Sequence, residues 1–297
     1  MAKQRAARPI ALSKPKRTRA LRGAAQTRTR TRGKVAKAVA AATPRSLTVV
    51  GIGASAGGLE AVTRLLQRLP PDSGLSFVVV QHLAPNHESL LPELLGASTR
   101  LSVVQARQGM PLLPNRVHVI PPNVQMTALR GKLHLAPRPH DRSQYTPIDT
   151  FFRSLAEHGL DRVVGIVLSG SAADGAMGLR EIKSVGGITF AQDPKSAKHD
   201  GMPRAAISTG AVDLVLPPER IADELARLGA HPFINEPRQP APEAAPDFIN
   251  DKQLETLFYL LRSASGVDFS QYKQPTIRRR LQRRMALLKT ADAAAYL

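Results

Sequence analysis

The sequence predicts an α/β domain with a doubly wound, mostly parallel sheet that carries helices on both faces. Three observations predict this class. Between residues 47 and 234, short apolar runs alternate with segments whose apolar residues recur at helical spacing. Some of the short runs, such as Phe77 to Val80, are continuously apolar, which is typical of strands buried on both faces. The first run also breaks into small residues and passes directly into a helical pattern, as in strand–helix–strand folds.

The same pattern places each element in order. The predicted strands cover residues 47–52, 76–81, 101–105, 116–120, 163–168, 188–191 and 212–216. The predicted helices cover residues 57–69, 87–97, 148–158, 176–185, 202–209 and 218–228. Two further apolar runs, 124–129 and 132–135, flank Arg130 and Gly131 and predict a β-hairpin, because a glycine-containing pair suits a tight turn.

Most of the charge lies at the beginning of the chain. The 297 residues carry a formal net charge of +19, and residues 1–46 hold 14 of the 42 Lys and Arg but none of the 23 Asp and Glu. This segment is too poor in apolar residues to offset its ordering entropy, so we expect a disordered basic tail. Attraction of the tail to nucleic acid or an anionic surface is a second interpretation, and it would be unspecific.

Two compositional features bear on the compartment. The chain has no Cys, which suits a reducing compartment, and we therefore expect a cytoplasmic protein. It has no run of 18 uninterrupted apolar residues, so we expect no insertion into a membrane.

The end of the chain predicts a linker and a small all-α segment. Residues 235–247 are rich in Pro, Ala, Glu and Gln and read as a semi-rigid linker. Residues 248–297 contain two amphipathic helical patterns, the first of which is expected to stop at Gly266. About 50 residues are too few for a robust independent core, so we expect the truncated start of a larger domain. The second helix should carry five arginines on the face opposite its apolar residues: Arg278, Arg279, Arg280, Arg283 and Arg284.

A serine stands at the first strand-to-helix turn. Ser55 lies in a small-residue stretch, where its hydroxyl should be exposed beside the free N–H groups of Ala56 and Gly57 at a helix N-terminus. A nucleophile, the Ser55 hydroxyl, would then lie next to an anion-binding site formed by these N–H groups. The glycine spacing also fits a dinucleotide-binding turn, but the second strand ends in Gln81 and His82 and lacks the acid that holds the ribose. An ordinary glycine-rich turn is the third interpretation.

Three strand ends carry residue types that work together in nucleophilic catalysis. Ser55, His82 and Asp174 each follow a predicted strand, and the carboxyl ends of parallel strands gather at one edge. Singly, His82 could be a half-buried strand-end histidine, and Asp174 could cap the helix after Gly175. Asp193 and Asp213 are rival acids, although Asp193 stands before a proline and fits a turn better, and Asp213 lies within a predicted strand. Converging, Ser55, His82 and Asp174 supply a nucleophile, a general base and an orienting acid.

No metal site is expected. His118 and His134 fall in predicted strands, and His82 and His87 are separated by a strand-to-helix junction. None of them has a Cys partner or the spacing of a helical zinc pair.

Four motifs follow one another in a fixed order: residues 52–58 (IGASAGG), 80–82 (VQH), 169–175 (SGSAADG) and 200–206 (DGMPRAA). Together they resemble the catalytic domain of chemotaxis protein-glutamate methylesterases, the CheB family, over residues 47–234. The resemblance implies hydrolysis of glutamate γ-methyl esters on the cytoplasmic helices of chemoreceptors, and deamidation of receptor glutamines, with no cofactor. It assigns the catalytic roles to Ser55, His82 and Asp174.

The oxyanion of this reaction is expected to be stabilised by the backbone N–H groups of Ala56 and Ser171. Two departures from the family pattern bear on this expectation. The family usually has Thr where this chain has Ala56, and Met and Gly where it has Ser171 and Ala172. These departures motivate a rival hypothesis, a catalytically weak scaffold that tethers a methyltransferase to receptors.

Residues 266–273 and 276–285 resemble the start of chemotaxis receptor methyltransferases, the CheR family. The order implies an esterase–methyltransferase fusion cut within the methyltransferase's helical region, with S-adenosylmethionine needed only by the missing part. The resemblance also implies that the five arginines of the second helix contact acidic receptor helices. A merely solvated charged face is the alternative.

Overall fold

The computed structural model describes residues 47–83, 89–139, 141, 145–157, 162–230, 249–270, 272, 274–290 and 292–297. The predicted basic tail and linker lie outside these residues, as does His87. The described residues all belong to one compact unit. Among the described helices, none combines the length and the apolar character that crossing a bilayer requires.

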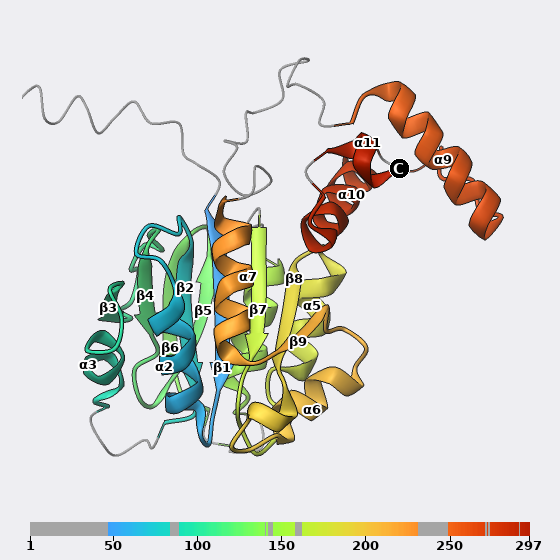
Figure 1. Cartoon of the computed structure of the whole chain (residues 1–297). Coiled ribbons are helices and arrows are strands. Elements are labelled where there is room, and N and C mark those ends of the chain that lie inside the picture. Colours follow the sequence, from blue (N-terminus) through green and yellow to red (C-terminus); the bar gives the residue numbers. More distant parts are fainter. Residues whose placement is uncertain are drawn as a thin grey trace, which may run out of the picture. The chain divides into compact units, whose positions relative to one another are not determined.

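The predicted fold class is confirmed by a seven-stranded sheet in which every pair of neighbouring strands is parallel (Figure 1). Its order is β3-β4-β2-β1-β7-β8-β9. β1 pairs with β2 on one side and with β7 on the other, so the winding of the chain reverses at this central strand. The strands are β1 (Thr48–Ala54), β2 (Ser76–Gln81), β3 (Ser102–Gln105), β4 (Arg116–Val119), β7 (Arg162–Val167), β8 (Ile188–Gln192) and β9 (Leu214–Leu216).

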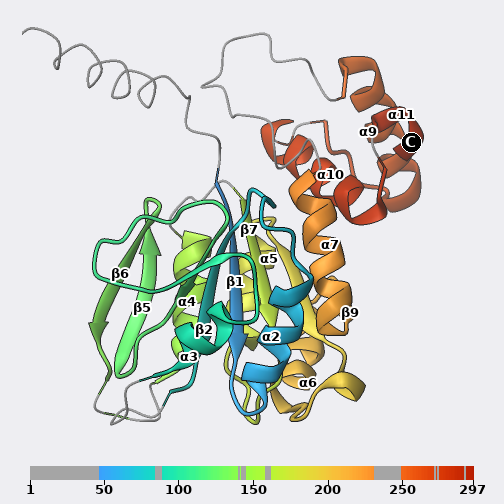
Figure 2. The same cartoon turned by 60° about the vertical axis from the view of Figure 1, so that its left-hand side comes forward.

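Helices cover both faces of the sheet, each over its own apolar cluster. One face carries α2 (Gly58–Arg68), α3 (Leu91–Gly96) and α7 (Pro218–Ala230). The other carries α4 (Pro147–Glu157), α5 (Ala176–Ser184) and α6 (Gly201–Ser208), together with the antiparallel hairpin of β5 (Val124–Leu129) and β6 (Lys132–Pro137). Figure 2 shows the hairpin apart from the main sheet, on the side of α4.

Several element bounds differ from those expected. The helix predicted over 87–97 begins, in the described part of the chain, only at Leu91, where Pro92 stands in its first turn. A 3-10 turn, η2 (Pro194–Ser196), follows β8. The last strand begins after Asp213 rather than at residue 212.

Two glycines on the central strand allow α4 to pack close to the sheet. A Cβ atom at Gly51 would lie 2.8 Å from Cε1 of Phe152, and one at Gly53 would overlap the side chain of Ile148. Both contacts come from α4, so the helix occupies space that a side chain on β1 would otherwise fill.

The C-terminal segment folds into α9 (Asp251–Ser265), α10 (Gln274–Leu288) and α11 (Ala293–Tyr296). Asn250 and Gln253 form a capping box at the start of α9, and Gly266, at a φ of 71°, ends that helix as predicted. A small apolar cluster joins the three helices: Ile249, Leu254, Leu257, Leu281, Met285 and Ala293.

Candidate active site

Ser55 occupies the turn between β1 and α2. The turn is closed by two backbone hydrogen bonds, from Ser55 N to the Ser169 carbonyl (2.9 Å) and from Gly58 N to the Ser55 carbonyl (2.8 Å). Gly57 has a φ of 70°, and a Cβ atom there would lie 2.8 Å from Oγ of Ser169. Glycine is therefore required at this position both by the backbone conformation and by the close approach of the neighbouring loop.

His82 follows β2 and lies between the other two predicted site residues. Its Nδ1 is 3.0 Å from Oγ of Ser55, and its Nε2 is 2.9 Å from Oδ2 of Asp174. The positions of the two ring nitrogens are the reverse of those in serine proteases, where Nε2 faces the serine. With the proton on Nε2 and donated to Asp174, Nδ1 is free to accept the proton of the Ser55 hydroxyl. The His82 side chain is 28% exposed, so it is reachable from solvent.

Asp174 follows β7 and is almost fully buried, with 5% of its side chain exposed. Besides the histidine, it accepts backbone N–H groups from Ile148 to Oδ2 (3.0 Å) and from Asp149 to Oδ1 (2.8 Å). Both donors lie in the first turn of α4, where the helix dipole favours a negative charge. These three donors fix the orientation of the carboxylate.

Asp174 does not act as a cap for the helix that follows it. α5 begins at Ala176, its N-cap is Gly175, and no side chain caps it by a hydrogen bond. The carboxylate is instead turned toward α4 and His82. The capping interpretation of Asp174 is therefore wrong.

The rival acids lie elsewhere. Asp193 accepts the backbone N–H of Lys195 at 3.1 Å and caps η2, in keeping with the turn expected there. Asp213 stands just before β9, at the amino end of its strand, whereas His82 follows the carboxyl end of β2. Neither aspartate is the acid that His82 contacts.

Ser169 joins the nucleophile turn to two other loops. Its hydroxyl donates to the Ala56 carbonyl (2.8 Å) and accepts the backbone N–H of His199 (3.0 Å). Its own N–H donates to the side chain of Gln192 at 2.9 Å. Within the described part of the chain, the N–H groups of Ala56 and Ser171 donate no hydrogen bond to the protein. The loops are thus held in place while these two donors stay available.

Sequence reasoning missed Tyr145 and Asp149, which no local pattern marks. The ring centroid of Tyr145 lies 6.3 Å from that of His82, and the Arg138 guanidinium lies 3.9 Å above the tyrosine ring. Burial raises the pKa of Tyr145, and the charge of Arg138 opposes this rise. Asp149 is buried beside Asp174 and accepts the Gly178 N–H at 2.6 Å. Burial, and then the charge of Asp174, raise the pKa of Asp149 against the effect of its backbone hydrogen bonds.

The five arginines of α10 do not share one solvated face. Arg280 and Arg284 are exposed. Arg278 instead donates to the Ile249 carbonyl and to Asp251, and Arg283 donates to Asp213 and to the Gly187 carbonyl. The side chain of Arg279 lies outside the described residues. Among the described His, Asp and Glu residues, no group of three is placed to hold a metal ion.

Comparison with known proteins places both parts of the chain. The family model described as CheB methylesterase matches residues 50–225, and the model described as CheR methyltransferase, all-alpha domain, matches residues 252–297. A crystal structure of the CheB methylesterase catalytic domain of Thermotoga maritima superposes with a TM-score of 0.57 and 29% sequence identity. The match covers 62% of this chain and 99% of that one.

Curated relatives of the chain are named for the same methylesterase activity. A protein-glutamate methylesterase/protein-glutamine glutaminase of Burkholderia thailandensis is 39% identical over 197 residues, which are 65% of this chain and 57% of the relative. One from Syntrophus aciditrophicus is 36% identical over 186 residues, covering 61% of this chain and 53% of the relative. The chain thus spans a little over half the length of these relatives. Since the CheB model matches more than half of the residues, the chain belongs to the CheB methylesterase family.

Proposed function

We propose that this chain hydrolyses glutamate γ-methyl esters on the cytoplasmic helices of chemoreceptors. The names of the relatives, and the family to which the chain belongs, support this substrate class. The observation that carries the proposal is the continuous hydrogen-bonded path from Asp174 through His82 to the Ser55 hydroxyl. The relatives' names also support deamidation of receptor glutamines, which proceeds through the same acyl intermediate.

The proposed reaction has two halves. Ser55 Oγ attacks the ester carbonyl carbon while Nδ1 of His82 takes the hydroxyl proton, and the same nitrogen then gives that proton to the departing methoxide. Methanol leaves, and the glutamyl group stays on Ser55 as an ester. Water, deprotonated by His82, attacks this ester and restores the serine, which releases glutamate. Asp174 keeps the Nε2 proton in place and stabilises the imidazolium in both halves.

The backbone N–H groups of Ala56 and Ser171 are proposed to stabilise the oxyanion that forms in each half. Their availability supports the role, since neither donates to another described residue. The role belongs to the backbone, so the departures from the family pattern at Ala56 and Ser171 leave the donors in place. The loop that carries Ser171 is close to the nucleophile, because a Cβ atom at Gly170 would lie only 3.0 Å from Cβ of Ser55.

The ordered relay also argues against the rival hypothesis of a catalytically weak scaffold. A scaffold has no need to hold a buried carboxylate with three donors and to place a histidine between it and a serine hydroxyl. The proposed esterase step uses only these side chains and water. Residues 252–297 match an all-alpha domain alone, so we assign any requirement for S-adenosylmethionine to a methyltransferase catalytic region and not to this segment.

The test is labelling with a serine-directed fluorophosphonate, followed by mass spectrometry of the labelled peptide. We expect a single adduct on Ser55 and none on the Ser55→Ala variant, which should also release no methanol from methylated receptor. Ser169→Ala is the control for the labelling alone, because it removes a neighbouring hydroxyl but leaves the nucleophile, and it should still form the adduct on Ser55. An unlabelled Ser55 in the folded protein, or methanol release by Ser55→Ala near the parent rate, would refute the assignment.

A further inference from the structure

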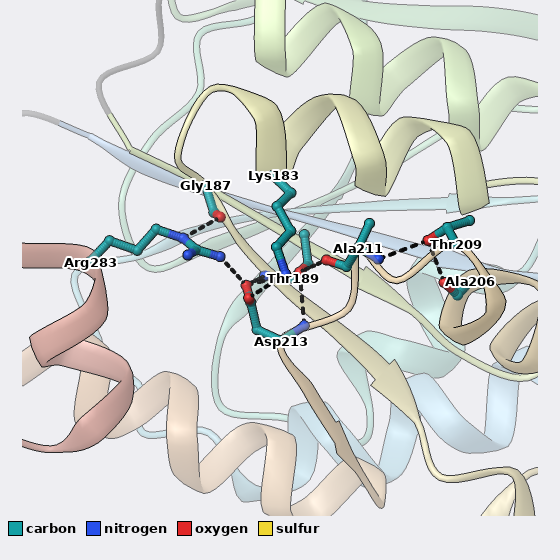
Figure 3. A network of polar contacts seen from close by, with 8 residues as sticks. All are labelled: Lys183, Gly187, Thr189, Ala206, Thr209, Ala211, Asp213 and Arg283. Atoms are coloured by element: carbon teal, nitrogen blue, oxygen red, sulfur yellow. Dashed lines mark hydrogen bonds and ion pairs between the residues drawn. The ribbon is translucent and has the colours of Figure 1, made fainter. Parts of the chain in front are cut away.

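The helix α10 contacts the esterase domain. Arg283 reaches two groups on that domain, donating from Nε to the Gly187 carbonyl at 2.9 Å and from its terminal nitrogen to Oδ2 of Asp213 (Figure 3). Only 16% of the Arg283 side chain is exposed. A guanidinium suits this geometry, because its rigid fork of donors can serve a carbonyl and a carboxylate at once.

The acceptor side of this contact is assembled by the esterase domain itself. The Asp213 side chain is 7% exposed and accepts the Thr189 N–H at 3.0 Å, the Thr189 hydroxyl at 2.9 Å and the Lys183 ammonium at 3.0 Å. Burial raises the pKa of Asp213, but the charge of Arg283 and the hydrogen bond from Lys183 outweigh it and hold the pKa below its usual value. Thr189 and Lys183, which belong to the esterase domain, thus hold the Asp213 carboxylate in addition to Arg283. We call Asp213 and the Gly187 carbonyl the arginine notch.

Apolar contacts accompany the polar ones. Ala286 of α10 is fully buried in the apolar cluster that contains Leu225 and Leu228 of α7, and Leu287 packs against the same cluster. Lys289 adds a more exposed ion pair with Glu224 at 2.8 Å. A chance contact of a tethered helix would not be expected to bury an alanine completely in the core of its neighbour.

The notch lies at the edge of the sheet opposite the proposed triad. Gly187 and Asp213 immediately precede β8 and β9, whereas Ser55 and His82 follow the carboxyl ends of β1 and β2. All these strands are parallel, so the amino ends and the carboxyl ends form two separate edges.

We propose that the arginine notch docks the methyltransferase-type segment onto the esterase domain through Arg283, on the edge that leaves the esterase site open. Docking makes the two regions one unit and not two modules that move independently. It also removes Arg283 from the surface that could meet an acidic receptor helix and leaves Arg280 and Arg284 exposed.

The experiment uses the absence of native cysteine from the whole chain. Arg180, exposed on α5, and Glu255, exposed on α9, are replaced by Cys and spin-labelled, and the distance between the labels is measured by pulsed electron resonance. The docked arrangement predicts one narrow distance distribution in the parent. Arg283→Glu should broaden it severely, because it places a negative charge against a buried carboxylate. Arg284→Glu, the exposed neighbour on the same helix, should leave it unchanged.

Arg283→Lys keeps the charge but replaces two separated donor nitrogens by a single ammonium, so an intermediate broadening is expected even if the glutamate variant folds poorly. Turnover of a small soluble ester is followed in every variant and should stay at the parent rate, which separates failure of docking from failure of the proposed esterase. A broad distribution in the parent, or a distribution in both Arg283 variants as narrow as in the parent, would overturn the proposal.

Discussion

Replacement of Asp174 by Asn is the sharpest test of the proposed relay, because it turns one hydrogen-bond acceptor of the side chain into a donor and leaves the shape of the side chain almost unchanged. The carboxylate accepts from Nε2 of His82 and from the N–H groups of Ile148 and Asp149. An asparagine has one oxygen for these three donors, and its other terminal atom is itself a donor. If the amide oxygen keeps the Asp149 N–H, the amide nitrogen faces both Ile148 N and His82 Nε2.

Two costs follow from this mismatch. His82 must move its proton to Nδ1 in order to accept from the amide, and Nδ1 can then no longer take the Ser55 proton. In the serine-protease triad the same substitution lowers kcat about 10⁴-fold through the wrong tautomer, and we expect a loss of about 10³- to 10⁴-fold here. The buried Ile148 N–H also loses its acceptor, which should lower the free energy of unfolding by about 1–3 kcal/mol.

The assay is kcat on a small methyl ester, with urea unfolding measured on the same preparations. Asp149→Asn is the matched control, since this neighbouring buried aspartate accepts from Gly178 and does not contact His82. It keeps an oxygen for that bond, and its activity should stay within a few-fold of the parent. A folded Asp174→Asn variant with kcat within about 10-fold of the parent would refute the reasoning that the tautomer of His82 matters.

Three further predictions concern other described groups. Ser169→Ala removes the hydroxyl that ties the Ala56 carbonyl to the adjacent loop, so kcat should fall about 10-fold or more while KM for a small ester changes little. A loss of activity that is matched by a lower melting temperature of the variant would indicate only a structural role. His118 is fully buried, and burial lowers its pKa below the ordinary value of 6.5. Below that pH the unfolded chain binds a proton that the folded chain does not, so the free energy of unfolding should decrease as the pH is lowered, by up to about 1.4 kcal/mol per pH unit, until the lowered pKa is reached. His118→Leu should abolish this pH dependence in urea unfolding measured at several pH values. An unchanged dependence in the variant would assign it to other groups. Arg280→Glu with Arg284→Glu should weaken salt-sensitive binding to receptor helices, more so for unmethylated ones, and salt-independent binding in a pull-down series would leave these arginines as a solvated face.

The proximity of the three proposed catalytic side chains could be predicted from the sequence. Ser55, His82 and Asp174 each follow a strand, and β2, β1 and β7 are adjacent at the centre of the sheet. Parallel alignment then puts the ends of these strands at one edge, so topology alone supplies the convergence.

The surroundings of the site were not predictable in the same way. The donors to Asp174 lie at the start of α4, 25 and 26 residues earlier in the chain, and reach the carboxylate only because that helix packs on the sheet. Arg283 stands in a charged pattern that looks solvated, yet its acceptors Gly187 and Asp213 lie 96 and 70 residues away. Helical periodicity describes the faces of one helix and carries no information on which distant carboxylate will meet them.

The two glycines of β1 set how closely α4 packs against the sheet, and the hydrogen bonds to the proposed acid depend on that distance. Gly51 and Gly53 meet Phe152 and Ile148 where side chains would otherwise stand. The same Ile148 donates its N–H to Asp174 at 3.0 Å, a distance that tolerates little displacement of the helix. A methyl group added to the middle of the sheet would act as a spacer that lifts the helix from the carboxylate. Substitution at these two glycines is thus constrained by proton transfer at the edge of the sheet as well as by the volume of the interior.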